Sequence, residues 1–85
     1  MSVPRETPLS VDAYSCRRAL ETGGVGARVQ LNAVGRAYGL HKRSSQSGRI
    51  VGWGRKPWCV RVRRDGLKRR ETYNAMFWEL ERSNG

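Results

Sequence analysis

Hydrophobic and polar positions alternate with a period of two in residues 27–32 and 58–64, and residues 49–53 and 67–73 form two further short runs of similar length between turn signals. Such alternation places successive side chains on opposite faces of a β-strand, so each run is predicted to be a strand. In the clearest run, one face carries Trp58, Val60 and Val62 and the other carries Cys59, Arg61 and Arg63. The first run is predicted to bury Ala27, Val29 and Leu31.

Turn-forming residues separate these strands. Pro57 closes a short connection that also carries Arg55 and Lys56, and Asp65-Gly66 is the strongest short turn signal in the chain. Short alternating strands joined by tight turns predict antiparallel pairing. The fold is therefore expected to be mostly β.

The N-terminal part follows a different pattern. Residues 1–9 form a proline-containing leader, and residues 10–24 are predicted to be an α-helix that Ser10 caps and Gly23-Gly24 ends. Ala13, Cys16 and Leu20 give it a narrow apolar stripe for packing on the β-unit. The alternative is that this segment is disordered.

Two further segments complete the chain. Residues 33–47 have no sustained period and are predicted to be a long, flexible basic loop, with a short helical turn near residues 34–38. After Asn74 a short closing helical turn is expected. Its aromatic and aliphatic side chains would seal the β-unit, and residues 83–85 would form a tail.

The positive charge is concentrated on the predicted β-unit. The 85-residue chain has 17 basic and seven acidic residues, for a net charge of +10. Thirteen of the basic residues, but only one acid (Asp65), lie between Arg28 and Arg70. A concentrated basic patch predicts a polyanionic partner, and the planar arginine side chain suits phosphate. The alternative is a solvated face that only keeps the protein soluble.

Cysteine and histidine usage argues against an enzyme. Cys16, His41 and Cys59 lack the spacing of metal ligands, so neither a metal nor another cofactor is expected. His41 has no acid near it in the sequence, and no glycine-rich phosphate loop is present. The N-terminus lacks the apolar core of a signal peptide and no long apolar run occurs. We therefore expect a cytoplasmic protein with free thiols and no membrane contact.

The motifs of residues 48–80 resemble a known fold group. Gly-Arg-Ile-Val-Gly at 48–52, Cys-Val-Arg-Val at 59–62, Asp65-Gly66, and Tyr73 followed by Phe77 are similar to SH3-like small barrels of the KOW, Tudor and chromo type. They also resemble a set of short, uncharacterised phage and proteobacterial proteins. Arg64 departs from that set, which has an aromatic residue before Asp-Gly. The resemblance implies an SH3-like barrel over residues 25–82.

The candidate binding residues fall into three groups. Arg49, Arg61, Arg63 and Arg70 are expected to form a charged face on the sheet. Trp53, Arg55 and Lys56 are expected at a hairpin tip, where Trp53 would stack on a base or, alternatively, fold back beneath a nearby arginine. Arg36, Lys42 and Arg43 lie in the basic loop, which is either a clamp for a phosphate backbone or only a linker.

These features predict a small protein that binds DNA or RNA mainly through the phosphate backbone, with low sequence specificity. A second hypothesis uses the same arginines differently. In it, the protein is an interaction module or inhibitor that binds an acidic surface of a polymerase or of a phage-defence complex. The sequence does not distinguish DNA from RNA and does not indicate an oligomeric state.

Overall fold

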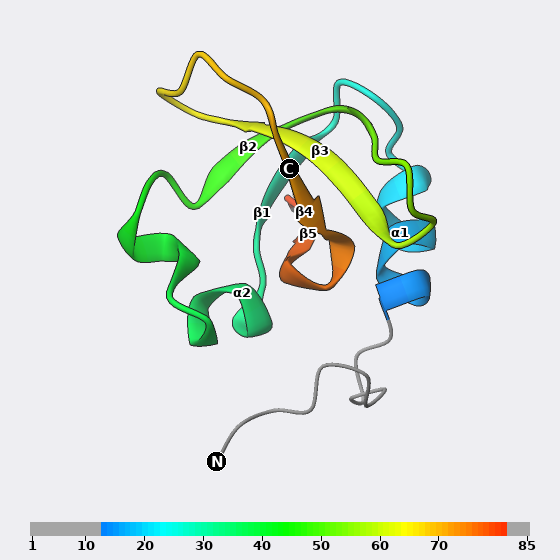
Figure 1. Cartoon of the computed structure of the whole chain (residues 1–85), viewed down its shortest axis with the longest axis horizontal. Coiled ribbons are helices and arrows are strands. Elements are labelled where there is room, and N and C mark those ends of the chain that lie inside the picture. Colours follow the sequence, from blue (N-terminus) through cyan, green and yellow to red (C-terminus); the bar gives the residue numbers. More distant parts are fainter. Residues whose placement is uncertain (1–12, 82–85) are drawn as a thin grey trace.

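The computed structural model describes residues 13–81 (Figure 1). Its elements, in chain order, are α1 (Ala13–Glu21), β1 (Arg28–Leu31), α2 (Ala33–Ala37), the 3-10 helix η1 (Leu40–Lys42), β2 (Ser47–Trp53), β3 (Cys59–Arg64), β4 (Glu71–Asn74), the 3-10 helix η2 (Ala75–Phe77) and β5 (Trp78–Leu80). The predicted leader, the first residues of the predicted helix and the tail lie outside the described residues.

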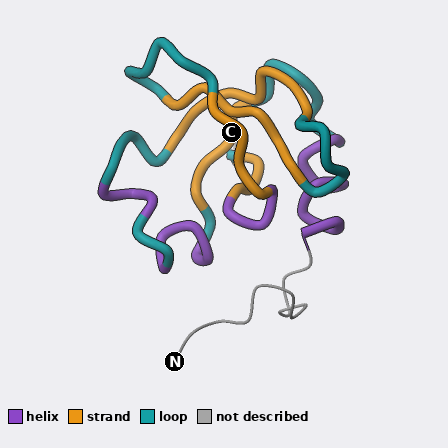
Figure 2. Tube along the Cα trace, viewed as in Figure 1, coloured by secondary structure: helices purple, strands orange, loops and turns teal. Residues whose placement is uncertain are grey.

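The strands form a single antiparallel sheet with the order β4-β3-β2-β1-β5 (Figure 2). Successive strands β1 to β4 pair as neighbours, and the chain then returns through η2 to place β5 on the free side of β1. This arrangement confirms the prediction of a mostly β fold. The alternation of apolar and polar residues predicted these strands because one face of the sheet is buried and the other faces solvent.

The hydrophobic core lies on one face of the sheet. It consists of Leu20, Val29, Leu31, Ile50, Val60, Val62, Ala75 and Trp78, all of which are buried. Leu20 comes from α1, and Cys16 on the same helix also packs against this cluster. The predicted apolar stripe therefore does dock α1 onto the β-unit. Cys16 and Cys59 are not joined in a disulfide bond.

The fourth strand is shorter than predicted. The Asp65-Gly66 turn forms, with Gly66 at φ +86°, but the chain rejoins the sheet only at Glu71. Residues 67–70 form a loop in which Lys68, Arg69 and Arg70 are all exposed. Three consecutive cations cannot alternate between core and solvent, because every second one would be buried unpaired. Pairing with β3 is thus limited to the stretch Cys59–Val62.

The predicted basic loop contains two short helices, α2 and η1. Asn32 caps α2, because its side-chain oxygen accepts a 2.9 Å hydrogen bond from the Gly35 N–H. The helical turn expected near residues 34–38 is therefore confirmed, and η1 follows it. The segment is therefore not irregular throughout: it has its own local hydrogen bonds, and Arg64 bonds to three of its carbonyls.

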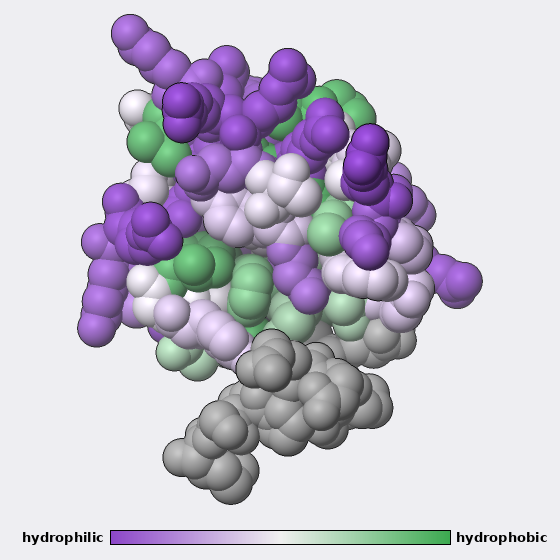
Figure 3. All heavy atoms as spheres, viewed as in Figure 1, coloured by the Kyte–Doolittle hydropathy of each residue, from purple (hydrophilic) through white to green (hydrophobic). Residues whose placement is uncertain are grey.

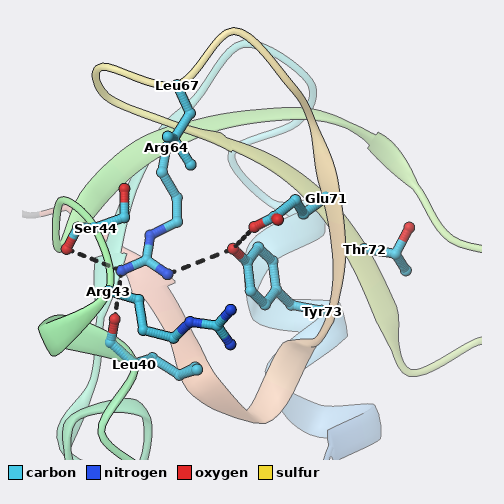
Figure 4. A pocket seen from close by; sticks show the side chains of 8 residues that line it. All are labelled: Leu40, Arg43, Ser44, Arg64, Leu67, Glu71, Thr72 and Tyr73. Carbon is cyan, nitrogen blue, oxygen red and sulfur yellow. Dashed lines mark hydrogen bonds between the residues drawn. The ribbon is translucent and has the colours of Figure 1, made fainter.

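Arg64 is a buried cation at the end of β3. It is only 3% exposed, because its position in the strand points it to the core side. Its Nε donates to the Ser45 carbonyl at 2.8 Å. Its Nη2 donates to the carbonyls of Leu40 (2.6 Å) and Ser44 (3.1 Å) (Figure 4). These bonds fasten the η1 segment to the sheet.

A register shift between Ile50 and Gly52 changes the face of the sheet on which the last side chains of β2 lie. Ile50 lies opposite Val62, but Gly52 lies opposite Arg61, so one residue of β2 is unpaired there. A bulge of this kind reverses the alternation beyond it. Trp53 is consequently opposite Val60, on the core side of the sheet.

Candidate nucleic-acid interface

Three arginines lie side by side across the outer face of the sheet. In the antiparallel register, Arg28 on β1 is opposite Arg49 on β2, and Arg49 is in turn opposite Arg63 on β3. Residues directly opposite one another on one face have their Cβ atoms roughly 5 Å apart. Like charges this close repel, so the row, which we call the arginine row, is suited to an anionic ligand.

Acidic partners neutralise one end of the arginine row. Both oxygens of Asp65 accept hydrogen bonds from the Arg28 guanidinium, at 2.8 and 2.7 Å. Glu81 lies 3.6 Å from the Nε atom of Arg28. The hydrogen bonds to Arg28, assisted by the charges of Arg49 and Arg63, hold the pKa of the Asp65 carboxyl below its ordinary value. The same contact raises the pKa of Arg28.

The other two members of the row have no carboxylate bound to them within residues 13–81. Arg49 donates to the Gly26 carbonyl at 2.9 Å, and Arg63 is exposed on the outer face. Together with Lys68 and Asp65 they line a hollow of about 250 Å³ next to the β3–β4 connection. Arginine forks and a lysine ammonium converging on one small hollow can bind a phosphate group.

The remaining predicted face residues extend this charged surface in part. Arg61 is exposed on β3 opposite Thr72, one row away from Arg63. Arg70 was expected on the same strand face, but it lies in the loop before β4 because β4 begins later than predicted. Figure 3 shows hydrophilic side chains gathered over the end of the molecule that carries the β3–β4 connection.

Trp53 is not on the arginine row's side of the sheet. The ring is half-buried and packs against the core, and the Arg17 guanidinium lies 4.7 Å from its centroid. Arg17 also donates to the carbonyls of Lys56 (3.2 Å) and Cys59 (2.9 Å). This is the folded-back arrangement that the sequence left as the alternative to base stacking. The arginine involved comes from α1 rather than from the hairpin.

The hairpin tip and the 33–47 segment hold the other candidates. Arg55 and Lys56 are exposed in the β2–β3 turn, and the Lys56 ammonium lies 5.6 Å from the Trp58 ring centroid. Arg36 is committed to a 2.8 Å hydrogen bond with the Leu31 carbonyl. Lys42 and Arg43 are exposed, and Arg43 lines a different hollow from that of the arginine row.

Sequence reasoning missed Arg28, Lys68 and Asp65 as parts of this surface. Arg28 had a signal, because it alternates outward on the first predicted strand. Its position beside Arg49 depends on the pairing of β1 with β2, which no local pattern shows. Asp65 follows Arg28 by 37 residues in the chain, so their bidentate contact likewise depends on the tertiary structure.

The described residues show neither metal chemistry nor a membrane span. No group of three or more His, Cys, Asp or Glu side chains among residues 13–81 is arranged to hold a metal ion. Over the same residues, no helix has the length and apolar character to cross a bilayer. No protein-family model, curated protein or solved structure matches the chain.

Proposed function

We propose that this protein binds nucleic acid through the phosphate backbone, with low sequence specificity. The arginine row carries the proposal, since Arg49 and Arg63 are adjacent, exposed and without a bound carboxylate in the described part of the chain. Two like charges in this arrangement lower the stability of the folded chain, and an anion between them removes that cost.

The exposed cations around the row support a polyanion rather than a single small anion. Lys68, Arg69 and Arg70 follow one another in the β3–β4 loop, and Arg61 lies one row away on β3. Several cations in succession match the repeating charge of a phosphodiester chain. Contacts to phosphate carry no base information, which is why low sequence specificity is expected.

We also propose that the fold is an SH3-like small barrel. Two features support this: the meander order β4-β3-β2-β1-β5, and the 3-10 turn η2 that leads the chain into β5 beside β1. Folds of this kind bind many unrelated partners, so the proposed function rests on the arginine row and not on the architecture.

The proposal is tested by measuring the affinity for labelled duplex DNA, single-stranded DNA and RNA across a salt series. Each phosphate contact contributes about 0.9 to the slope of log K against log salt on duplex DNA. Arg49→Gln combined with Arg63→Gln should therefore reduce the slope by about two, and Arg63→Gln alone by about one.

Arg18→Gln is the matched control, because Arg18 is an exposed arginine on α1, away from the row. Its slope should equal that of the unmodified protein. Equal losses in Arg18→Gln and Arg63→Gln would show that only net charge matters. No binding of any of the three nucleic acids at low salt would contradict the proposal and favour an acidic protein surface as the partner.

A further inference from the structure

A second hollow lies beside the arginine row and has a different character. It measures about 380 Å³ and lies between the η1 segment on one side and β4 on the other (Figure 4). Leu40 and Leu67 give its walls two aliphatic side chains, and Tyr73 adds a phenol ring. The polar lining includes the Glu71 carboxylate, the Ser44 hydroxyl and the Arg43 guanidinium. Its volume is within the roughly 300–1,000 Å³ that is typical of small-molecule sites.

Hydrogen bonds hold the back of this hollow together. The buried Arg64 guanidinium is held by three carbonyls, and it also donates to the Tyr73 hydroxyl at 3.4 Å. That hydroxyl in turn donates to Glu71. Burial, together with the hydrogen bond to Glu71, raises the pKa of Tyr73, so the phenol keeps its proton. The Tyr73 ring packs edge-on against Trp78, with 5.2 Å between ring centroids.

The two hollows adjoin one another. Leu67 and Arg64 line both, one hollow lying toward the outer face of the sheet and the other toward the core side. Leu67 is 38% exposed, so part of its side chain is open to solvent between the two hollows. It stands where a bound chain would pass from one hollow to the other.

The two hollows differ in the charge of the residues that line them. Arg49, Arg63 and Lys68 leave the outer hollow strongly positive against Asp65. The second hollow sets Glu71 against Arg43, and its buried Arg64 already donates to three backbone carbonyls and to the Tyr73 hydroxyl. A phosphate is thus favoured in the outer hollow, whereas a flat, polar-edged and nearly neutral group is favoured in the second.

We propose that the second hollow receives one unstacked nucleobase of the strand whose phosphates lie on the arginine row. This inference rests on the proposed function. A nucleotide carries its phosphate and its base on either side of the sugar, as the adjoining hollows require. Leu40, Leu67 and the Tyr73 ring contact the faces of the base. Glu71 accepts from its amino or ring N–H groups, and Arg43, which extends toward Tyr73, donates to its carbonyl oxygen or ring nitrogen (Figure 4).

The ligand class follows from this geometry. A base paired within a duplex cannot enter a hollow of this kind without being extruded, which costs stacking and pairing energy. The preferred ligand is therefore single-stranded nucleic acid, or a site with an unpaired nucleotide.

The experiment compares three labelled ligands of equal length at one salt concentration: single-stranded DNA, the same strand with every base replaced by an abasic sugar, and the duplex. The single strand should bind about tenfold tighter than the abasic strand, as expected when a bound base loses its stacking contact. It should also bind tighter than the duplex. The unmodified protein suffices for this comparison.

Leu67→Ser then tests the placement. It should weaken binding of the base-bearing strand about fivefold and leave the abasic strand unchanged. The matched control is Val25→Ser, since Val25 is 62% exposed and lines neither hollow. It should change neither affinity.

The outcomes separate the two proposals. Equal affinities for the base-bearing and abasic strands, with a steep salt dependence, would overturn the base site and leave phosphate binding in place. Duplex binding as tight as single-strand binding would also overturn it. No binding of any ligand at low salt would overturn the base site together with the proposed function.

Discussion

Replacing Arg64 by methionine should test how the η1 segment is held to the sheet. Methionine keeps a long, flexible and apolar side chain, so the space beside β3 stays filled. It donates no hydrogen bonds. The carbonyls of Leu40, Ser44 and Ser45 would each lose a charged donor that now lies at 2.6 to 3.1 Å.

The size of the effect follows from opposing contributions. A hydrogen bond from a charged donor contributes about 1.5–3 kcal/mol, so three of them represent roughly 5–9 kcal/mol gross. Methionine removes the cost of burying a guanidinium, which is several kcal/mol, and the partly buried carbonyls regain water if the segment loosens. We expect the free energy of unfolding to fall by about 2–4 kcal/mol, a large part of the total for a small domain.

Arg64→Lys separates hydrogen-bond geometry from charge. Lysine keeps the positive charge, but its compact ammonium cannot reach acceptors arranged around a planar guanidinium. A buried charge with fewer partners is costly. The lysine variant should therefore be at least as destabilised as the methionine variant.

Urea denaturation followed by tryptophan fluorescence and circular dichroism measures these differences. Arg61→Met is the control, because Arg61 is exposed on the same strand and has no hydrogen-bond partner among the described side chains. Its unfolding free energy should change by less than about 0.5 kcal/mol. An Arg64→Met protein as stable as the unmodified one, or full rescue by lysine, would refute the reasoning.

Three further predictions concern single contacts. Arg28 lowers the pKa of the Asp65 carboxyl, so Asp65 should stabilise the fold at pH values above its ordinary pKa and lose this effect as the pH falls through the lowered pKa; Asp65→Asn should flatten the curve of stability against pH in that range. Gly48→Ala should lower the unfolding free energy by about 1–3 kcal/mol, because a Cβ would lie 2.6 Å from a β3 carbonyl oxygen; unchanged denaturation midpoints would contradict this. Arg17→Ala should shift Trp53 emission and speed amide exchange in α1, and unaltered exchange would show that Arg17 does not hold the helix.

Local pattern was enough for the strands and for most of the core. Val29, Leu31, Val60 and Val62 are buried where the period-two alternation placed them, because one face of an antiparallel sheet is apolar by necessity. The short turn of helix after Asn74 also formed as expected.

The environment of Arg64 could not be predicted from the local pattern. Its position in the alternation is on the core side, but an arginine there conflicts with the rule that unpaired charges are excluded from the core. Its partners are backbone carbonyls some twenty residues earlier in the chain. A carbonyl has no sequence signature, so this anchor was not predictable from residue types.

The sequence by itself determined the class of the fold, the concentration of positive charge and the membership of most of the core, since each depends on residue type and local period. Tertiary structure alone decided which charges meet. The pairing of β1 with β2 completes the arginine row with Arg28, and the bulge after Ile50 turns Trp53 to the other side. Both depend on strand register, and a shift of one residue there exchanges the two faces of a strand.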